Sequence, residues 1–199
     1  GHEMVRGFQR AGQAMGVQML ADIRHPIGTA DFSAFLPRIQ ALKPDILVLN
    51  NFGRDQLNAV KQATDFGLKS TMKIITPILL YTARMAGGPE AFEGVVGGTS
   101  YYWGLEDKVP TAKAFNDKYR KAYGGGVPSD YGALGYADVR RVLHAVRDSK
   151  STESVTVSIA LRQRPSNVCK RESLHRTCDP RAVHAVICVE TKPTELKAR

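Results

Sequence analysis

The residues best placed to bind a ligand follow an apolar run, Ile-Leu-Val-Leu, at residues 46–49. Asn51, Phe52 and Gly53 lie just after this run, in a short loop before the next helical pattern. In open α/β sheets, ligands bind at loops that follow the carboxyl ends of strands. An aromatic side chain beside a glycine leaves apolar surface and backbone N–H groups for a small molecule. The sequence leaves open whether Phe52 contacts that ligand or packs back onto the following helix.

The sequence contains no set of residues that is typical of a catalytic site or a metal site. The glycine pairs lack the lysine and the spacing of a phosphate-binding loop. No serine stands in a nucleophile elbow, and no two histidines have the helical spacing that is typical of a zinc site. Four carboxylates have capping or solvent-facing roles open to them: Asp31, Asp45, Asp55 and Asp65. We therefore do not expect an enzyme, and we expect no cofactor and no bound metal.

The segments around this loop alternate between helix and strand. Hydrophobic periodicity predicts helices over residues 1–15, 32–42, 54–66 and 79–85, and strands over residues 17–23, 46–49, 73–76 and 94–100. Asp31 would cap the second helix, Pro44 would end it, and Gly67 would stop the third. The continuous apolar run at 46–49 is typical of a strand buried on both faces. This pattern predicts a three-layer α/β fold, a parallel sheet with helices on both faces.

The pattern changes after residue 100. Tyr101, Tyr102 and Trp103 follow the last predicted strand, and they either fill a core or domain seam or contact a ligand. Periodicity predicts two successive helices, over residues 109–123 and from Ser129, as the cap, to about residue 147. A polar linker is expected at residues 149–154. Two strands are expected within residues 174–190, around a turn at Asp179-Pro180.

The net charge is +9, with 28 Lys and Arg against 19 Asp and Glu. The basic residues are spread along predicted helix faces, and the densest stretch, residues 162–176, has no interleaved aromatic side chains. Such a distribution is typical of a solvated surface, so we expect no nucleic-acid partner. No apolar stretch is long enough to span a membrane, and no signal peptide is visible.

All three cysteines, Cys169, Cys178 and Cys188, lie in the last third of the chain. Their spacing fits no zinc-ligand pattern. Cys188 stands in an apolar run and is expected to be a small core residue. Cys169 and Cys178 could pair in an exported protein, and the sequence does not decide whether they do.

Several motifs together resemble the type I periplasmic solute-binding proteins of the branched-chain amino-acid ABC transporter group, which includes the Leu/Ile/Val-binding proteins. The segments that carry the resemblance are TADFSAF, ILVLNN, NAVKQATDFGL, GGTSYYW and the closing VHAVICVETKPTELK. The resemblance covers nearly the whole chain and is weakest at residues 149–176. It implies a C-terminal portion of such a protein: residues 1–100 as the second α/β lobe, 101–150 as the hinge crossing and helices returning to the first lobe, and 151–199 as a linker and C-terminal hairpin.

The resemblance also implies a site and a function. Ligand contacts would fall on Asn51, Phe52, Gly53, Asp55, Thr76, Pro77, Ile78 and Leu79, and the hinge on Tyr101, Tyr102 and Trp103. The protein would capture a small ligand, an organic acid or an amino acid, and deliver it to the membrane permease of an ABC importer in the periplasm. Amino-acid binders of this group can hold the ligand ammonium with an acidic residue where this chain has Pro77-Ile78-Leu79, so a carboxylate without an ammonium is favoured.

Two alternative functions would be marked by other features of the sequence. A ligand-sensing domain of a receptor or regulator shares the fold, and only flanking sequence would separate it from a transport protein. An α/β enzyme of the nucleotide-binding type should carry a glycine fingerprint, which this chain lacks.

Overall fold

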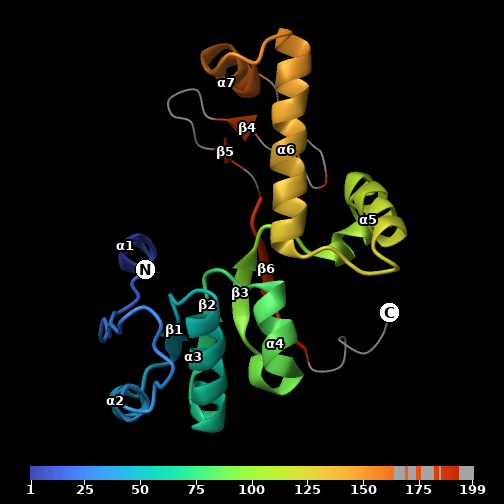
Figure 1. Cartoon of the computed structure of the whole chain (residues 1–199). Coiled ribbons are helices and arrows are strands. Elements are labelled where there is room, and N and C mark those ends of the chain that lie inside the picture. Colours follow the sequence, from blue (N-terminus) through green and yellow to red (C-terminus); the bar gives the residue numbers. More distant parts are fainter. Residues whose placement is uncertain (164–168, 170–173, 176–181, 184, 193–199) are drawn as a thin grey trace. The chain divides into compact units, whose positions relative to one another are not determined.

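The computed structural model describes residues 1–163, 169, 174–175, 182–183 and 185–192 (Figure 1). The chain divides into two compact units. The first contains Gly1–Gly98 and the segment that begins at Cys188, and the second contains Thr99–Ile187. Each unit has its own cluster of buried apolar side chains.

The first unit is built on a sheet with the strand order β1-β2-β3-β6. Its strands are β1 (Ile46–Val48), β2 (Lys73–Thr76), β3 (Val96–Thr99) and β6 (Ile187–Glu190). β1 pairs with β2 in parallel, and β2 pairs with β3 in parallel. The predicted strands at 46–49, 73–76 and 94–100 are therefore confirmed, and so is the α/β class with a parallel sheet.

Two strand predictions are wrong. Ile46 is 48% exposed, so β1, which is at the edge of the sheet among the described strands, is not buried on both faces. The alternating segment at residues 17–23 forms no strand, and Val17, Met19 and Leu20 are exposed. A segment with an alternating pattern forms a strand only where a neighbouring strand supplies hydrogen bonds to its backbone. Among the described strands, the neighbour of β1 is β2, and residues 17–23 do not pair with β1.

Four α-helices belong to the described part of the first unit: α1 (His2–Ala14), α2 (Leu36–Leu42), α3 (Arg54–Asp65) and α4 (Tyr81–Phe92). α3 ends as predicted, with Gly67 at φ +79° just beyond it. α2 begins later than predicted, because Asp31 accepts a hydrogen bond from the N–H of Ser33 and caps the turn before the helix. α4 extends past its predicted end, with a break at Gly88, where φ is +81°.

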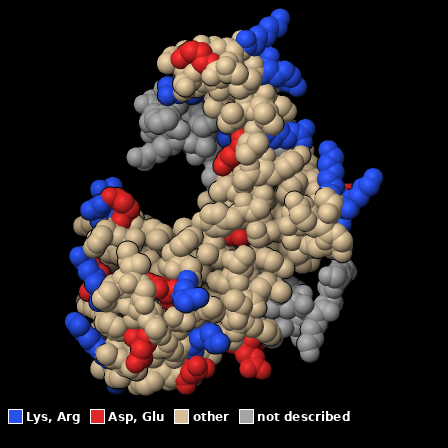
Figure 2. All heavy atoms as spheres, in the orientation of Figure 1, with Lys and Arg blue, Asp and Glu red and all other residues tan. Residues whose placement is uncertain are grey.

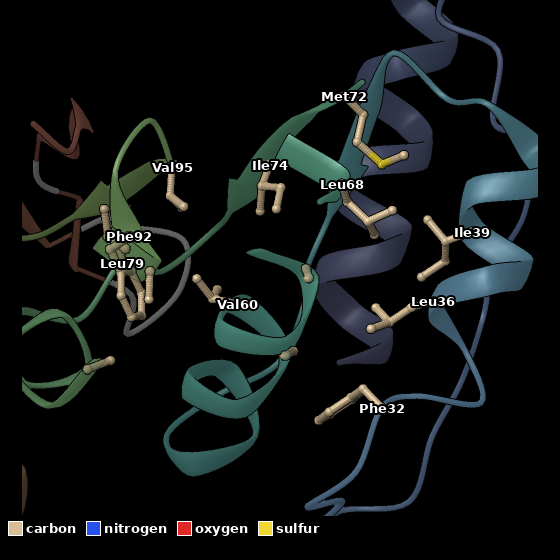
Figure 3. Close-up of a cluster of buried hydrophobic side chains, with 14 of the residues drawn as sticks. Phe32, Leu36, Ile39, Val60, Leu68, Met72, Ile74, Leu79, Phe92 and Val95 are labelled. Atoms are coloured by element: carbon tan, nitrogen blue, oxygen red, sulfur yellow. The ribbon is translucent and has the colours of Figure 1, made fainter. Parts of the chain in front are cut away.

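The core of the first unit gathers around α3 (Figure 3). Val60 of α3 and Ile74 of β2 are buried together with Phe92 at the end of α4. α3 and α4 pack against each other over one face of the sheet (Figure 1). Phe32, Leu36 and Ile39 extend the cluster toward Leu68 and Met72 (Figure 3). α1 contributes no buried residue.

The second unit is mainly helical. It contains the 3-10 helix η2 (Trp103–Asp107), the helices α5 (Pro110–Ala122), α6 (Asp130–Ser149) and α7 (Ser154–Gln163), and the antiparallel pair β4 (Leu174–His175) and β5 (Ala182–Val183). The Ser129 hydroxyl accepts from the N–H of Gly132, which confirms it as the cap of α6. α7 was not expected from the sequence. The predicted turn at Asp179-Pro180 lies outside the described residues.

A fully paired polar network holds the start of this unit together. The buried Tyr101 hydroxyl donates to Oδ1 of Asn116 (2.6 Å), whose Nδ2 donates to the Trp103 carbonyl (2.7 Å) and to Glu106 (2.8 Å). Arg120 makes two hydrogen bonds of 2.8 Å to the two oxygens of Glu106. Burial raises the pKa of Tyr101, and the hydrogen bonds from Arg120 lower the pKa of Glu106.

Several apolar side chains of α6 and α7 are exposed, namely Val139, Val142, Leu143, Val155 and Ile159. The inward face of α6 consists of small residues instead: Ala133, Ala137 and Ala145 are buried. The hydrophobic periodicity of the sequence predicts that Val142 points inward, and this prediction is wrong, because Val142 is 44% exposed. None of the described helices is long and apolar enough to cross a membrane.

Two of the three cysteines are described. Cys169 is buried, and its thiol lies 3.6 Å from the carbonyl oxygen of Ala133. Cys188 is exposed, because the side chains of β6 alternate between faces and Cys188 falls on the solvent side. The prediction of Cys188 as a core residue is wrong, and a pairing of Cys169 with Cys178 lies outside the described residues.

We expect Gly97→Ala to destabilise the first unit by roughly 1–3 kcal/mol, the range of overpacking in a core. A Cβ at this position would lie 2.5 Å from the Thr76 carbonyl oxygen and 2.6 Å from Cβ of Leu79. Gly135→Ala in α6 is the matched control, since its Cβ meets nothing within 4 Å and alanine favours a helix by about 0.5–1 kcal/mol. Urea unfolding measures both, and an unchanged Gly97→Ala variant would contradict the close approach of β3 to the loop after β2.

Glu106→Gln should reduce the loss of stability in acid. Because the folded-state pKa of Glu106 is lowered, its ion pair stabilises the fold above the ordinary pKa of glutamate, and this contribution disappears as the pH falls through the lowered value. Urea unfolding at a series of pH values should therefore show a shallower acid limb for the variant. Equal acid limbs in wild type and Glu106→Gln would show that the pair with Arg120 does not contribute to stability above the lowered pKa of Glu106.

Candidate functional site

The candidate site lies at the loops that leave the carboxyl ends of β1 and β2. Parallel strands end at the same edge of a sheet, so these two loops emerge side by side. Gln56, which is fully buried at the start of α3, joins them. Its Nε2 donates to the carbonyl of Ile78 (2.6 Å) and, at 3.4 Å, to the carbonyl of Asn51. This amide holds the backbone of both loops at a fixed separation.

The first loop presents the more accessible residues. Phe52 is 51% exposed, so its ring is not folded away into the core. Gly53 has φ of +60°, a conformation that L-residues with side chains rarely adopt, and it stands at the N-terminus of α3. Asn51 and Gly53 are half-buried. The structure thus places Asn51, Phe52 and Gly53 together at one edge of the sheet, as predicted, while their contact with a ligand remains a prediction.

The second loop, residues 76–79, is more deeply buried than the first loop. Thr76 and Leu79 are buried, and Pro77 and Ile78 are half-buried. The N–H of Leu79 donates to the Gly98 carbonyl (2.8 Å), which ties this loop to β3. Only Pro77 and Ile78 in this loop present part of their side chains to the surface. The role of Thr76, Pro77, Ile78 and Leu79 as ligand contacts stays untested.

Asp55 positions a third loop. Its Oδ2 accepts a hydrogen bond from the N–H of Gly28 (3.0 Å), so one oxygen of this predicted ligand contact is used to hold residues 24–30 against the start of α3. Gln62 fixes the end of the same loop, because its Nε2 donates to the Ala30 carbonyl (2.7 Å) and its Oε1 accepts from the N–H of Phe32 (2.7 Å).

His25, at the start of this loop, was not selected from the sequence. Its Nε2 lies 2.8 Å from Nδ2 of Asn51, and its Nδ1 lies 2.8 Å from the carbonyl oxygen of Pro26. The ring packs edge-on against Phe32, with 4.9 Å between ring centroids. The contact with Asn51 spans 26 residues of sequence. No periodic signal marks such a contact.

Three buried polar atoms near these strand ends have no hydrogen-bond partner in the described protein: Oδ1 of Asn50, Oε1 of Gln56 and Oγ1 of Thr76. Buried groups of this kind are costly unless they are paired, so they favour a polar ligand group or water at this edge of the sheet. Among the described residues, no group of three His, Cys, Asp or Glu side chains is placed to hold a metal ion.

The charged side chains of the first unit are of both signs. On the face shown in Figure 2, its Lys and Arg side chains are interspersed with Asp and Glu. The carboxylate of Asp22 pairs with Arg24 at 2.8 Å, next to the His25 loop. The backbone N–H of Ser33 lowers the pKa of Asp31. The Asp22–Arg24 pair is balanced in charge, whereas Asp31 keeps its negative charge because its partner is a neutral N–H.

The predicted hinge residues lie in the second unit. Tyr101 is buried in the polar network with Asn116, and it packs edge-on against Phe115 with 5.7 Å between ring centroids. Tyr102 and Trp103 are half-buried, with their ring centroids 5.0 Å apart. Tyr101 therefore fills core, which was one of the two roles left open for this cluster. The hinge role of the three residues stays a prediction.

Comparison with known proteins gives one consistent result. A family model described as periplasmic binding protein matches residues 1–195. A periplasmic binding protein from Burkholderia mallei is 31% identical, with a TM-score of 0.87, over 100% of this chain and 52% of its own. A branched-chain amino acid ABC transporter periplasmic ligand-binding protein from Burkholderia xenovorans is 27% identical, with a TM-score of 0.83, over 100% and 52%.

An amino acid ABC transporter substrate-binding protein from Pseudomonas fluorescens has the same fold, with 23% identity and a TM-score of 0.90 over 100% of this chain and 53% of its own. The chain thus spans about half the length of these solved structures. None of the curated proteins compared with the chain matches it.

Gln56→Leu should loosen the loop after β2. The Ile78 carbonyl loses its donor, while the burial of the unpaired Gln56 oxygen ends, so we expect a net cost of only about 1 kcal/mol in unfolding free energy. Hydrogen exchange at the Leu79 N–H should speed up, since that group belongs to the released loop. Gln40→Leu, at an exposed position of α2, should leave this exchange rate unchanged. Equal rates in wild type and Gln56→Leu would show that the amide does not hold the loop.

Proposed function

Because the chain belongs to the periplasmic binding protein family, we propose that it provides one wall of a solute-binding site in an ABC import system. The observation that supports this most directly is the pair of loops after β1 and β2, joined by Gln56, with the exposed ring of Phe52 on one of them. A rigid backbone edge beside an accessible aromatic ring suits capture of a small molecule.

The ligand we propose is a small organic acid or an amino-acid-like molecule. The relative from Burkholderia xenovorans is named as a branched-chain amino acid transporter component, which supports an amino-acid-like ligand. Pro77, Ile78 and Leu79 offer no carboxylate to an ammonium group, which favours an acid that lacks one. Apolar contact with Phe52 and Ile78 suits an aliphatic or aromatic body.

The remaining parts of the proposal follow from the family. Residues 1–100 would form one lobe, Tyr101, Tyr102 and Trp103 would lie at the hinge, and residues 101–150 would return toward a second lobe. The partner would be a membrane permease, and the place of action would be the periplasm. The family consists of binding proteins, which supports a role without catalysis.

Ligand-observed NMR on this chain tests the proposed function. We expect saturation-transfer signals from benzoate and 4-methylpentanoate that exceed those from leucine and valine, because the acids need no anionic partner for an ammonium. Such measurements detect weak binding, which is what one wall of a site should give. Signals from leucine and valine alone would overturn the choice of ligand class, and no signal from any of the four would count against the proposed function.

Phe52→Ala identifies where those acids bind. Loss of an aromatic contact should weaken binding by roughly 1–3 kcal/mol, because the acid loses its apolar partner. Phe66→Ala is the matched control, since Phe66 is also exposed but lies at the opposite end of α3. Equal weakening by both variants would remove Phe52 from the site.

A further inference from the structure

We propose that His25 determines which polar atom the candidate site offers to its ligand, by fixing the side-chain amide of Asn51. This inference rests on the proposed function only for the ligand itself, because the contact between His25 and Asn51 lies within the protein. An asparagine amide carries a donor on one side and an acceptor on the other. If one of these two atoms faces His25, the other atom of the Asn51 amide is available to a ligand at the loop after β1.

The tautomer of His25 follows from the groups around Nδ1. The Pro26 carbonyl oxygen, 2.8 Å from Nδ1, can only accept a hydrogen bond, so Nδ1 must carry a proton. The Thr29 hydroxyl lies 3.2 Å from the same nitrogen and donates its own proton to the Pro26 carbonyl (2.7 Å). It can therefore only accept from Nδ1. Both neighbours require the same Nδ1–H form of the ring.

The neutral ring then has a lone pair on Nε2, and this sets the direction of the Asn51 amide. Nε2 lies 2.8 Å from the amide, so it must accept a hydrogen bond from Nδ2 of Asn51. Oδ1 of Asn51 consequently points away from the imidazole. The opposite orientation would place two acceptors against each other at hydrogen-bonding distance, which is unfavourable.

The imidazole cannot easily turn to relieve this constraint. Its ring packs edge-on against Phe32 at 4.9 Å and against Phe35 at 6.3 Å between centroids. Its loop is held by the hydrogen bond from Gly28 to Asp55 and by Gln62 at the other end. His25 is thus fixed by packing, by Pro26 and by the loop contacts before it meets Asn51.

The consequence concerns the chemical class of the ligand. With Oδ1 of Asn51 as the available atom, the loop after β1 offers an acceptor, which favours a ligand that carries an O–H or N–H donor. A hydroxylated acid satisfies this acceptor and also needs no anionic partner at Pro77-Ile78-Leu79. His25 would act as a positioning residue in this selection, through Asn51.

NMR of the imidazole nitrogens tests the tautomer without any ligand. The chain has five histidines, and His25→Phe, which retains an aromatic ring against Phe32, identifies the His25 signals by their loss. In spectra recorded at about pH 8 we expect the Nδ1–H form for His25. The side-chain NH₂ signals of Asn51 should shift and exchange faster in His25→Phe. His2→Phe, the same substitution at an exposed position of α1, should change neither result.

Two NMR outcomes would overturn the proposal: an Nε2–H form of His25 in the wild type, or Asn51 NH₂ signals that are the same in wild type and His25→Phe.

A binding comparison extends the test to the ligand. Wild type should bind 4-hydroxybenzoate roughly 2- to 10-fold more tightly than benzoate, the scale of one hydrogen bond. His25→Phe should lose this preference, and a preference that persists in the variant would also overturn the proposal. Failure of wild type to bind either acid would count against the proposed function, while the NMR result stands independently.

Discussion

The parallel pairing of β1 with β2 is the constraint on which the arrangement of the first unit depends. Leu47 pairs with Ile74 and Val48 with Ile75, and the N–H of Leu49 continues the ladder to the Ile75 carbonyl (2.8 Å). This register brings the two loops out at one edge, within reach of a single glutamine side chain. If the register moved by one residue, Gln56 would no longer span the carbonyls of Asn51 and Ile78, and the side chains of the shifted strand would change faces.

Local signals in the sequence were sufficient for the elements that local interactions determine. The start of α6 follows from Ser129, whose hydroxyl caps it, and the end of α3 from Gly67 in the left-handed conformation. The misses have a different cause. Residues 17–23 alternate like a strand but do not pair with another strand. α7 has only one buried residue, Val157, so its sequence has no apolar face that would have predicted a helix. Tertiary contacts decided both outcomes.

The same distinction applies to the candidate site. The loop of Asn51, Phe52 and Gly53 could be found because its position after a strand is a property of one segment. The side chains that shape it could not. Gln56 looked like one more polar residue of an amphipathic helix, and His25 like an isolated residue in a loop, because their roles arise from contacts with segments 22 and 26 residues away. Thr76 and Leu79 were selected from the family resemblance, and their burial depends on packing against β3.

The exposed apolar side chains of α6 and α7 affect how the chain behaves in solution. Val139, Leu143 and Ile159 offer surface that favours association between molecules, whereas a net charge of +9 drives molecules apart. The charge term is screened over about 8–10 Å at moderate ionic strength, but the apolar term is not. Added salt therefore removes the repulsion and leaves the attraction. The colloidal stability of this chain should be governed by the ionic strength of its surroundings more than by the stability of its fold.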